Sequence, residues 1–178
     1  MISISDEFIY LSVKRETKPF IFKDITYHGV SIPKALQNTG QAYFEVLSES
    51  RLGQKIAVTS LERTFVDVLD RPHLCGSWEE IWRSLESIEY LNLGKVLGYV
   101  RLLDNATTTA RIGFFLDTHR EQWMIPESYL SEFQKYAPRQ PQYLSRDEKK
   151  EQKLIPKWNL IVPLDLINRE WEEPHENV

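Results

Sequence analysis

The sequence holds a single cysteine, Cys75, so no disulfide can form within the chain. It has no run of 18 apolar residues, and its first residues lack the basic segment and long apolar core of a secretion signal. These absences argue against a disulfide scaffold, a membrane-spanning chain and a secreted protein. We therefore expect a protein of a reducing compartment, the cytoplasm.

Basic charge is also scarce. The formal net charge is −4 and the pI is about 5.6, whereas nucleic-acid-binding domains usually carry a basic footprint. The seven glycines are scattered, with no G-x-G-x-x-G pattern and no phosphate-binding loop. The composition thus favours neither a nucleotide-dependent enzyme nor a protein that works mainly on nucleic acid.

What is present is typical of a globular domain. The chain has 178 residues, 42% of them hydrophobic and 27% charged, with five Trp, eight Tyr and eight Phe. We expect one α+β domain, residues 1–178, with a mainly β lobe at 1–58, a helical lobe at 59–137 and an irregular segment at 138–178. The predicted fold is a small, mostly antiparallel sheet from the N-terminal part plus a C-terminal strand, packed with about four or five helices.

Residues 7–60 alternate in the manner of strands, with β-branched and aromatic residues in short runs. His28-Gly29 is predicted to be a turn, and 38–40 another break in the pattern. Segments 42–46 and 54–58 are expected to form a hairpin.

After residue 59 the period changes to about 3.6. T-x-x-E at Thr59 and Glu62 and S-x-x-E at Ser77 and Glu80 predict capping boxes at two helix starts. Pro72 is expected to close the first of these helices. Further helices are predicted around 96–103, from near Asn105, and from near Pro126.

Residues 137–157 are locally basic, by a net charge of +3. The run at 147–153 is predicted to be a solvated loop or short helix, and 158–162 an apolar strand before an acidic tail. The candidate basic patch comprises Arg139, Arg146, Lys149, Lys150, Lys153 and Lys157.

The residues offer little catalytic chemistry. His28, His73, His119 and His175 lack metal-ligand spacing and are interpreted as isolated surface or turn histidines, so we expect no metal and no cofactor. Cys75 would be a nucleophile only beside a base. A metal-dependent nuclease would need clustered carboxylates and a lysine. Its candidates are Glu45, Glu62, Asp67 and Asp70, with Lys55 or Lys149. Capping and helix solvation explain these carboxylates better, so no catalytic residue is assigned.

One segment, 56–76, combines a strand, a capped helix, a charged helix end and a proline stop. Its Arg63 and Arg71 lie eight residues apart, close to two helical turns, so they share a face. Guanidinium groups so placed either tie the helix to its surroundings through carboxylates or meet a partner. Both interpretations stay open at this point.

The same segment resembles the AbiEi family of type IV antitoxins from abortive-infection (AbiE) systems. In that family a strand leads into S-x-E-R-T-hydrophobic-hydrophobic-D and then R-P-x-L-x-G. A second stretch, R-L-G-(Y/F)-L-L-E, and an ending with Lys-Trp follow. The matching residues here are Ser60, Glu62, Arg63, Thr64, Asp67, Arg71, Pro72, Leu74 and Gly76, then Arg111, Ile112, Gly113, Phe115 and Leu116, and finally Lys157 and Trp158.

The resemblance, over roughly residues 40–163, implies a bacterial, non-enzymatic antitoxin of phage defence. Its functional partner would be a nucleotidyltransferase-like toxin of the AbiEii type, with direct contact not required. Glu62, Arg63, Asp67, Arg71 and Arg111 become the candidate functional residues. Family members commonly carry an N-terminal winged-helix repressor domain, but residues 1–55 show no helix–turn–helix pattern. The resemblance therefore points to the C-terminal antitoxicity domain alone. The alternatives are a nucleic-acid-binding transcriptional regulator, with 139–157 and Arg101–Arg111 as its basic face, and a metal-dependent nuclease remnant.

Overall fold

A computed structural model describes residues 8–13, 15–145, 150–169 and 171. The chain has the predicted α+β class, with helices and small sheets. It divides into two compact units, Met1–Phe44 and Glu45–Val178, which are taken separately below. The hairpin expected as part of the β lobe therefore belongs with the helices of the second unit. Within the described residues, no helix is both long and apolar enough to cross a membrane.

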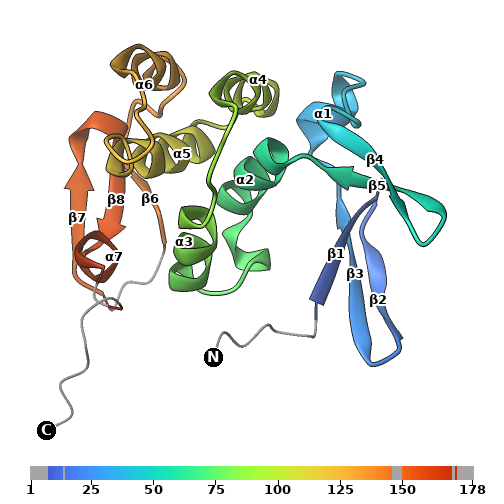
Figure 1. The fold of residues 1–178 in the computed structure, drawn as a ribbon. Coiled ribbons are helices and arrows are strands. Elements are labelled where there is room, and N and C mark those ends of the chain that lie inside the picture. Colours follow the sequence, from blue (N-terminus) through green and yellow to red (C-terminus); the bar gives the residue numbers. More distant parts are fainter. Residues whose placement is uncertain (1–7, 14, 146–149, 170, 172–178) are drawn as a thin grey trace, which may run out of the picture. The chain divides into compact units, whose positions relative to one another are not determined.

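The first unit contains a three-stranded sheet in the order β1-β3-β2. Its elements are β1 (Phe8–Val13), β2 (Thr17–Phe22), β3 (Ile25–Ser31) and helix α1 (Lys34–Asn38). β3 is antiparallel to β2 and parallel to β1 (Figure 1). The break predicted at 38–40 is confirmed, because α1 ends there and Gly40 has a φ of +69°.

The predicted turn at His28-Gly29 is wrong, because both residues lie inside β3. The turn between β2 and β3 is instead made by Lys23 and Asp24, both with positive φ. Gly29 pairs with Thr17, and a Cβ at Gly29 would come within 2.1 Å of the Thr17 Oγ1. The glycine thus permits a close approach between strands rather than a change of direction.

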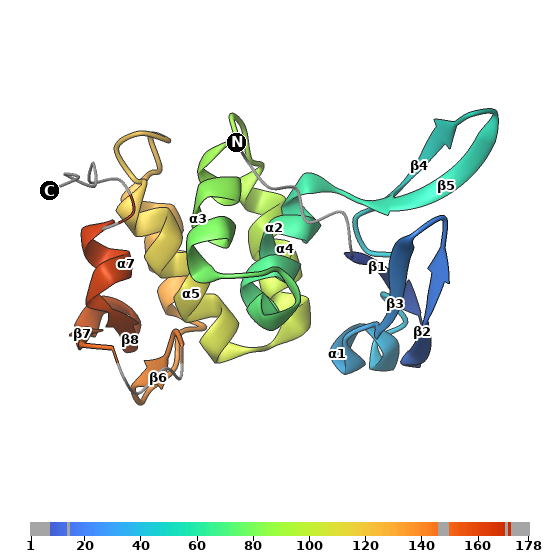
Figure 2. The same ribbon diagram turned by 90° about the horizontal axis from the view of Figure 1, so that it is seen from below.

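The second unit begins with a hairpin of β4 (Val46–Arg51) and β5 (Gln54–Thr59), which extends away from the helices of this unit (Figure 2). The second predicted strand is confirmed, but the first lies at 46–51 and not at 42–46. Leu52 and Gly53 both have positive φ, which matches a two-residue hairpin turn, and the strands extend up to it. Residues 42–45 fall in a turn, where the amide of Phe44 donates to the carbonyl of Gln41 at 2.9 Å.

The expected helices of the second unit are all present. They are α2 (Leu61–Asp70), α3 (Trp78–Glu86), α4 (Leu93–Leu103), α5 (Ala106–Thr118) and α6 (Glu127–Gln134). α5 lies among them and packs on α2 and α6, while α4 packs on α2. The core is rich in aromatic residues. The centre of the Phe115 ring lies 5.5 Å from the centre of the Phe65 ring and 4.9 Å from that of Trp82, and both pairs are in edge-to-face contact.

A third sheet follows in the order β6-β8-β7, so the C-terminal strand does not join the N-terminal strands. It contains β6 (Gln142–Tyr143), β7 (Gln152–Ile155) and β8 (Leu160–Pro163), and helix α7 (Leu164–Asn168) comes next. The interpretation of 147–153 as loop or short helix is wrong from Gln152 onward, because β7 pairs antiparallel with the apolar β8. The strand predicted at 158–162 is present as β8, but it begins at Leu160, two residues later than predicted. Trp158 instead ends a short 3-10 helix (Pro156–Trp158).

Candidate functional site

Helix α2 carries most of the candidate residues. Its apolar side chains Phe65, Val66 and Leu69 are buried, and its polar ones project along the adjoining faces. The predicted Thr59–Glu62 capping box is wrong. The N-cap is Ser60, whose hydroxyl accepts from the amide of Arg63 at 3.2 Å. Glu62 instead accepts from the backbone amide of Asn92 at 3.2 Å, which ties α2 to the start of α4.

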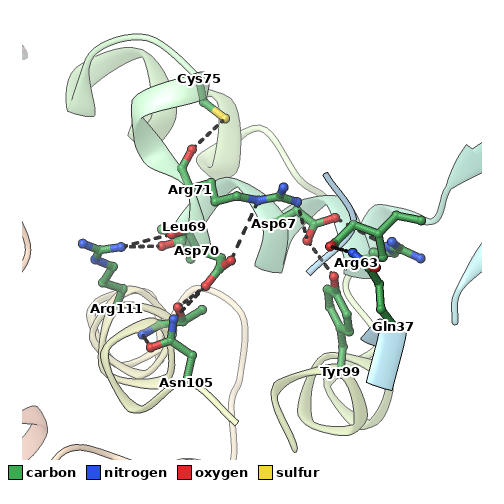
Figure 3. Close-up of polar contacts among 12 residues, drawn as sticks. Gln37, Arg63, Asp67, Leu69, Asp70, Arg71, Cys75, Tyr99, Asn105 and Arg111 are labelled. Atoms are coloured by element: carbon green, nitrogen blue, oxygen red, sulfur yellow. Dashed lines mark hydrogen bonds and ion pairs between the residues drawn. The ribbon is translucent and has the colours of Figure 1, made fainter. Parts of the chain in front are cut away.

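Asp67 is the centre of a polar network beneath α2 (Figure 3). The Tyr99 hydroxyl of α4 donates to it at 2.7 Å, and Arg63 and Arg71 each bring a guanidinium nitrogen to 3.5 Å. Burial raises the pKa of Asp67, although the Tyr99 hydrogen bond and the two arginines oppose that rise. The pKa of Tyr99 is raised as well, by its burial and then by the charge of Asp67 and the hydrogen bond to it.

Arg63 is only 1% exposed, and its guanidinium carbon lies 5.5 Å from the centre of the Tyr99 ring. Of the two interpretations left open by the sequence, the described contacts within α2 favour the structural one. Arg63 and Arg71 share a face as predicted, and both meet the carboxylate placed between them. A buried guanidinium is a costly group to leave unpaired, so this arrangement holds the network in one geometry.

A second set of contacts fixes the end of α2 against α5. Asp70 accepts from the side-chain amide of Asn105 at 3.0 Å and from the Thr108 hydroxyl at 2.5 Å. Arg111 donates to the backbone carbonyls of Leu69 at 3.0 Å and Leu144 at 3.3 Å (Figure 3 shows the contact with Leu69). A helix end leaves carbonyls without partners inside the helix, and Arg111 supplies donors there.

The structure therefore brings Arg63, Asp67 and Arg71 into one network and places Arg111 at the end of the same helix. Glu62 stands apart, at the junction with Asn92. Sequence reasoning missed Tyr99, Asn105 and Thr108 as partners. Asn105 had a signal, since it was expected near a helix start, and it is the N-cap of α5. For Tyr99 the sequence held no signal beyond its position in an apolar helix.

A cleft of about 520 Å³ adjoins this network on the Arg111 side. Asp70, Arg111 and the aromatic rings of Trp78 and Tyr143 line it, together with His73 and Gln142. The guanidinium carbon of Arg111 lies 5.8 Å from the Trp78 ring. The cleft is thus built from residues of the second unit that bracket the end of α2.

The described members of the candidate basic patch do not form one continuous, unpaired cationic surface. Lys150 pairs with Asp165 at 2.5 Å, and Lys157 pairs with Asp117 at 2.8 Å and with Glu127 at 3.4 Å. Arg139 and Lys153 are exposed. Arg146 and Lys149 lie outside the described residues. Arg101, named for the same alternative, pairs with Glu132 at 3.3 Å.

The carboxylates considered for a nuclease are engaged by groups of the chain itself. Glu45 pairs with Lys95 at 2.8 Å, while Glu62, Asp67 and Asp70 have the partners given above. Over residues 8–13, 15–145, 150–169 and 171, no three His, Cys, Asp or Glu side chains gather as a metal site would require.

Cys75 is half-buried and lies 3.8 Å from the carbonyl oxygen of Arg71. Burial raises the pKa of this thiol, which favours the uncharged form over the reactive thiolate.

The interpretation of the histidines needs one correction. His119 is not a surface residue: it is 1% exposed and contacts Glu86 at 2.8 Å. His73 is exposed, as expected, and His28 is partly buried in β3. His175 lies outside the described residues.

Comparison of this chain with protein-family models, with curated proteins and with solved structures finds no match.

Proposed function

We propose that this chain is an antitoxin that counteracts a nucleotidyltransferase-like toxin, as members of the AbiEi family do, and that it acts without catalysis. The support is the way in which the residues that carry the resemblance lie in the fold. A chance match of short motifs would scatter over unrelated places. Here Arg111 of α5 donates to the carbonyl of Leu69, at the end of the helix that carries Arg63, Asp67 and Arg71.

The later motif residues join the same framework. Asp117, at the end of the second motif stretch, accepts from the Lys157 ammonium at 2.8 Å and from the Trp158 indole nitrogen at 3.1 Å. The Lys-Trp ending thus closes onto α5. Residues far apart in sequence act together, which is what a family signature for a shared fold requires. The signature supports a common framework, and the antitoxin activity is proposed on that basis.

The carboxylates that a nuclease would use serve this framework. A divalent metal would have to displace Tyr99 and two arginines from Asp67, or Asn105 and Thr108 from Asp70. This favours an action through binding over an action through metal-assisted hydrolysis.

The test is growth. The neighbouring toxin gene is induced in cells that express this chain from a separate promoter, and an unrelated protein at the same level is the control. Restored growth with this chain alone supports the proposal. No rescue at a matched level of folded chain contradicts it. A mobility shift with the chain's own promoter DNA at low salt would then redirect the assignment to the nucleic-acid-binding alternative.

A further inference from the structure

The cleft at the end of α2 is lined by groups that suit a small planar ligand. Its volume of about 520 Å³ falls within the range of about 300–1,000 Å³ that is usual for small-molecule sites. Residues of α2, α3, α5 and β6 all contribute to its walls, and these elements all belong to the second unit. Side chains from distant parts of the sequence therefore converge on one hollow, as they do in binding sites.

Two aromatic side chains line the cleft from different elements. Trp78 stands at the start of α3 and Tyr143 in β6, and neither ring contacts another aromatic ring of the described chain. Tyr143 is 50% exposed. The guanidinium carbon of Arg111 lies over the Trp78 ring, 5.8 Å from its centre, and holds that ring at the wall. An aromatic face that opens into a cleft offers a platform on which another flat ring can stack.

A carboxamide beside the rings can bind the polar edge of such a ring. The side-chain oxygen of Gln142 accepts from the Thr107 hydroxyl at 3.4 Å, and the Gln142 backbone amide donates to the carbonyl of Asn159 at 2.8 Å. Its side-chain nitrogen has no partner among the described residues, and its oxygen keeps a second lone pair. A donor and an acceptor held side by side match the edge of a nucleobase, and that of adenine above all.

The charges of the cleft favour a neutral ring over an anion. Asp70 and Arg111 are the fixed charges that line it, one of each sign. Arg111 is already engaged by the backbone carbonyls of Leu69 and Leu144, and Asp70 accepts from the side chain of Asn105. The cleft thus has no excess of positive charge for a phosphate group, and the whole chain has a net charge of −4.

We propose that this cleft binds a neutral nucleobase, supplied as a free nucleoside, which stacks on Tyr143 and Trp78 and pairs its polar edge with Gln142. The ribose then lies toward solvent, where no charged partner is required. Binding at this site needs no toxin, so it is tested separately from the antitoxin function.

The experiment is equilibrium dialysis of the full chain against each of the four ribonucleosides. We expect saturable binding, tightest for adenosine. Tyr143→Ala weakens it by about 5- to 100-fold, the loss usual when the platform for one stacked base is removed. Tyr143→Phe keeps the ring and retains the affinity. Tyr129→Ala, at a tyrosine of α6 that does not line the cleft, leaves the affinity unchanged. Gln142→Leu reduces the preference for adenosine over the other nucleosides.

A short oligoriboadenylate distinguishes a free base from a base within a strand. Adenosine binding that changes little with salt supports the proposal, because no phosphate takes part. Binding of the oligonucleotide alone, with an affinity that falls steeply as salt rises, would mean that phosphate contacts carry the affinity, and it overturns the proposal. The absence of saturable binding for all four nucleosides, or an affinity that Tyr143→Ala leaves unchanged, overturns it as well.

Discussion

Gly113 and Trp158 approach so closely that no side chain fits between them. A Cβ at position 113 would come within 2.1 Å of the Trp158 ring carbon Cζ3, and Trp158 is fully buried. This contact seats the indole directly on the backbone of α5, and the indole nitrogen then reaches Asp117. It explains why a glycine stands in the middle of a helix, where it is otherwise unfavourable.

We predict that Gly113→Ala lowers the free energy of unfolding by roughly 1–3 kcal/mol, because overpacking forces the indole or the helix to move. Urea denaturation measures the loss. Trp158→Leu provides the control in a double-mutant cycle. The cost of the alanine must shrink in the Trp158→Leu background; equal costs in both backgrounds would mean that the contact does not restrict position 113.

The helices could be predicted from the sequence because their signals are local. Ser77 and Glu80 form the expected capping box of α3, and the apolar residues Ile81, Trp82 and Leu85 of that helix are buried. The position of β4 and the existence of β7 were not predicted correctly, and both errors have a physical reason. Polar residues make up most of β4 and half of β7, so neither segment shows a clear strand pattern until its partner strand is known.

The candidate site was only partly predictable. Arg63, Asp67 and Arg71 share a face of one helix, so their meeting follows from helical spacing alone. Tyr99, which comes from another helix, completes the network through packing that no local pattern encodes. Similarly, the buried place of His119 depends on α3 and on the end of α7, which lie far from it in sequence.

Tyr99→Phe should destabilise the chain by about 1.5–3 kcal/mol, the usual loss when a hydrogen bond to a charged group is removed. The phenylalanine keeps the ring beside Arg63 but leaves Asp67 without its 2.7 Å donor. Tyr90→Phe is the matched control, since Tyr90 is 74% exposed and its change should fall within about 0.5 kcal/mol. Similar midpoints of chemical denaturation for both variants would show that the Asp67 network contributes little.

Arg111→Lys should cost about 1–3 kcal/mol, since an ammonium cannot match the planar fork that reaches both Leu69 and Leu144 carbonyls, and buried acceptors lose their donors. Arg101→Lys, at an exposed pair with Glu132, is the control and should be nearly neutral. Thermal unfolding of the two variants side by side measures the difference. A neutral Arg111→Lys would argue against its role at the end of α2.

The capping box of α3 should make stability depend on pH. The Ser77 backbone amide and hydroxyl bind the Glu80 carboxylate and hold its pKa below the usual value of 4.5. The folded pKa is depressed, so this contribution is present above the ordinary pKa and is lost as the pH falls through the folded one. Glu80→Gln should therefore lower the melting temperature at about pH 6.5, and its difference from the wild type should be smaller at about pH 3. A constant difference at both pH values would contradict this assignment.

The proposed antitoxin function is tested most directly by colony formation under induction of the adjacent gene, which the proposal takes to encode the toxin, with wild-type chain or Gly113→Ala supplied in trans and their protein levels measured. We predict that the wild type restores colonies to the uninduced level and that Gly113→Ala restores them in proportion to its measured protein level. A wild-type chain that is folded and abundant, yet leaves colony numbers unchanged, would contradict the proposed antitoxin function.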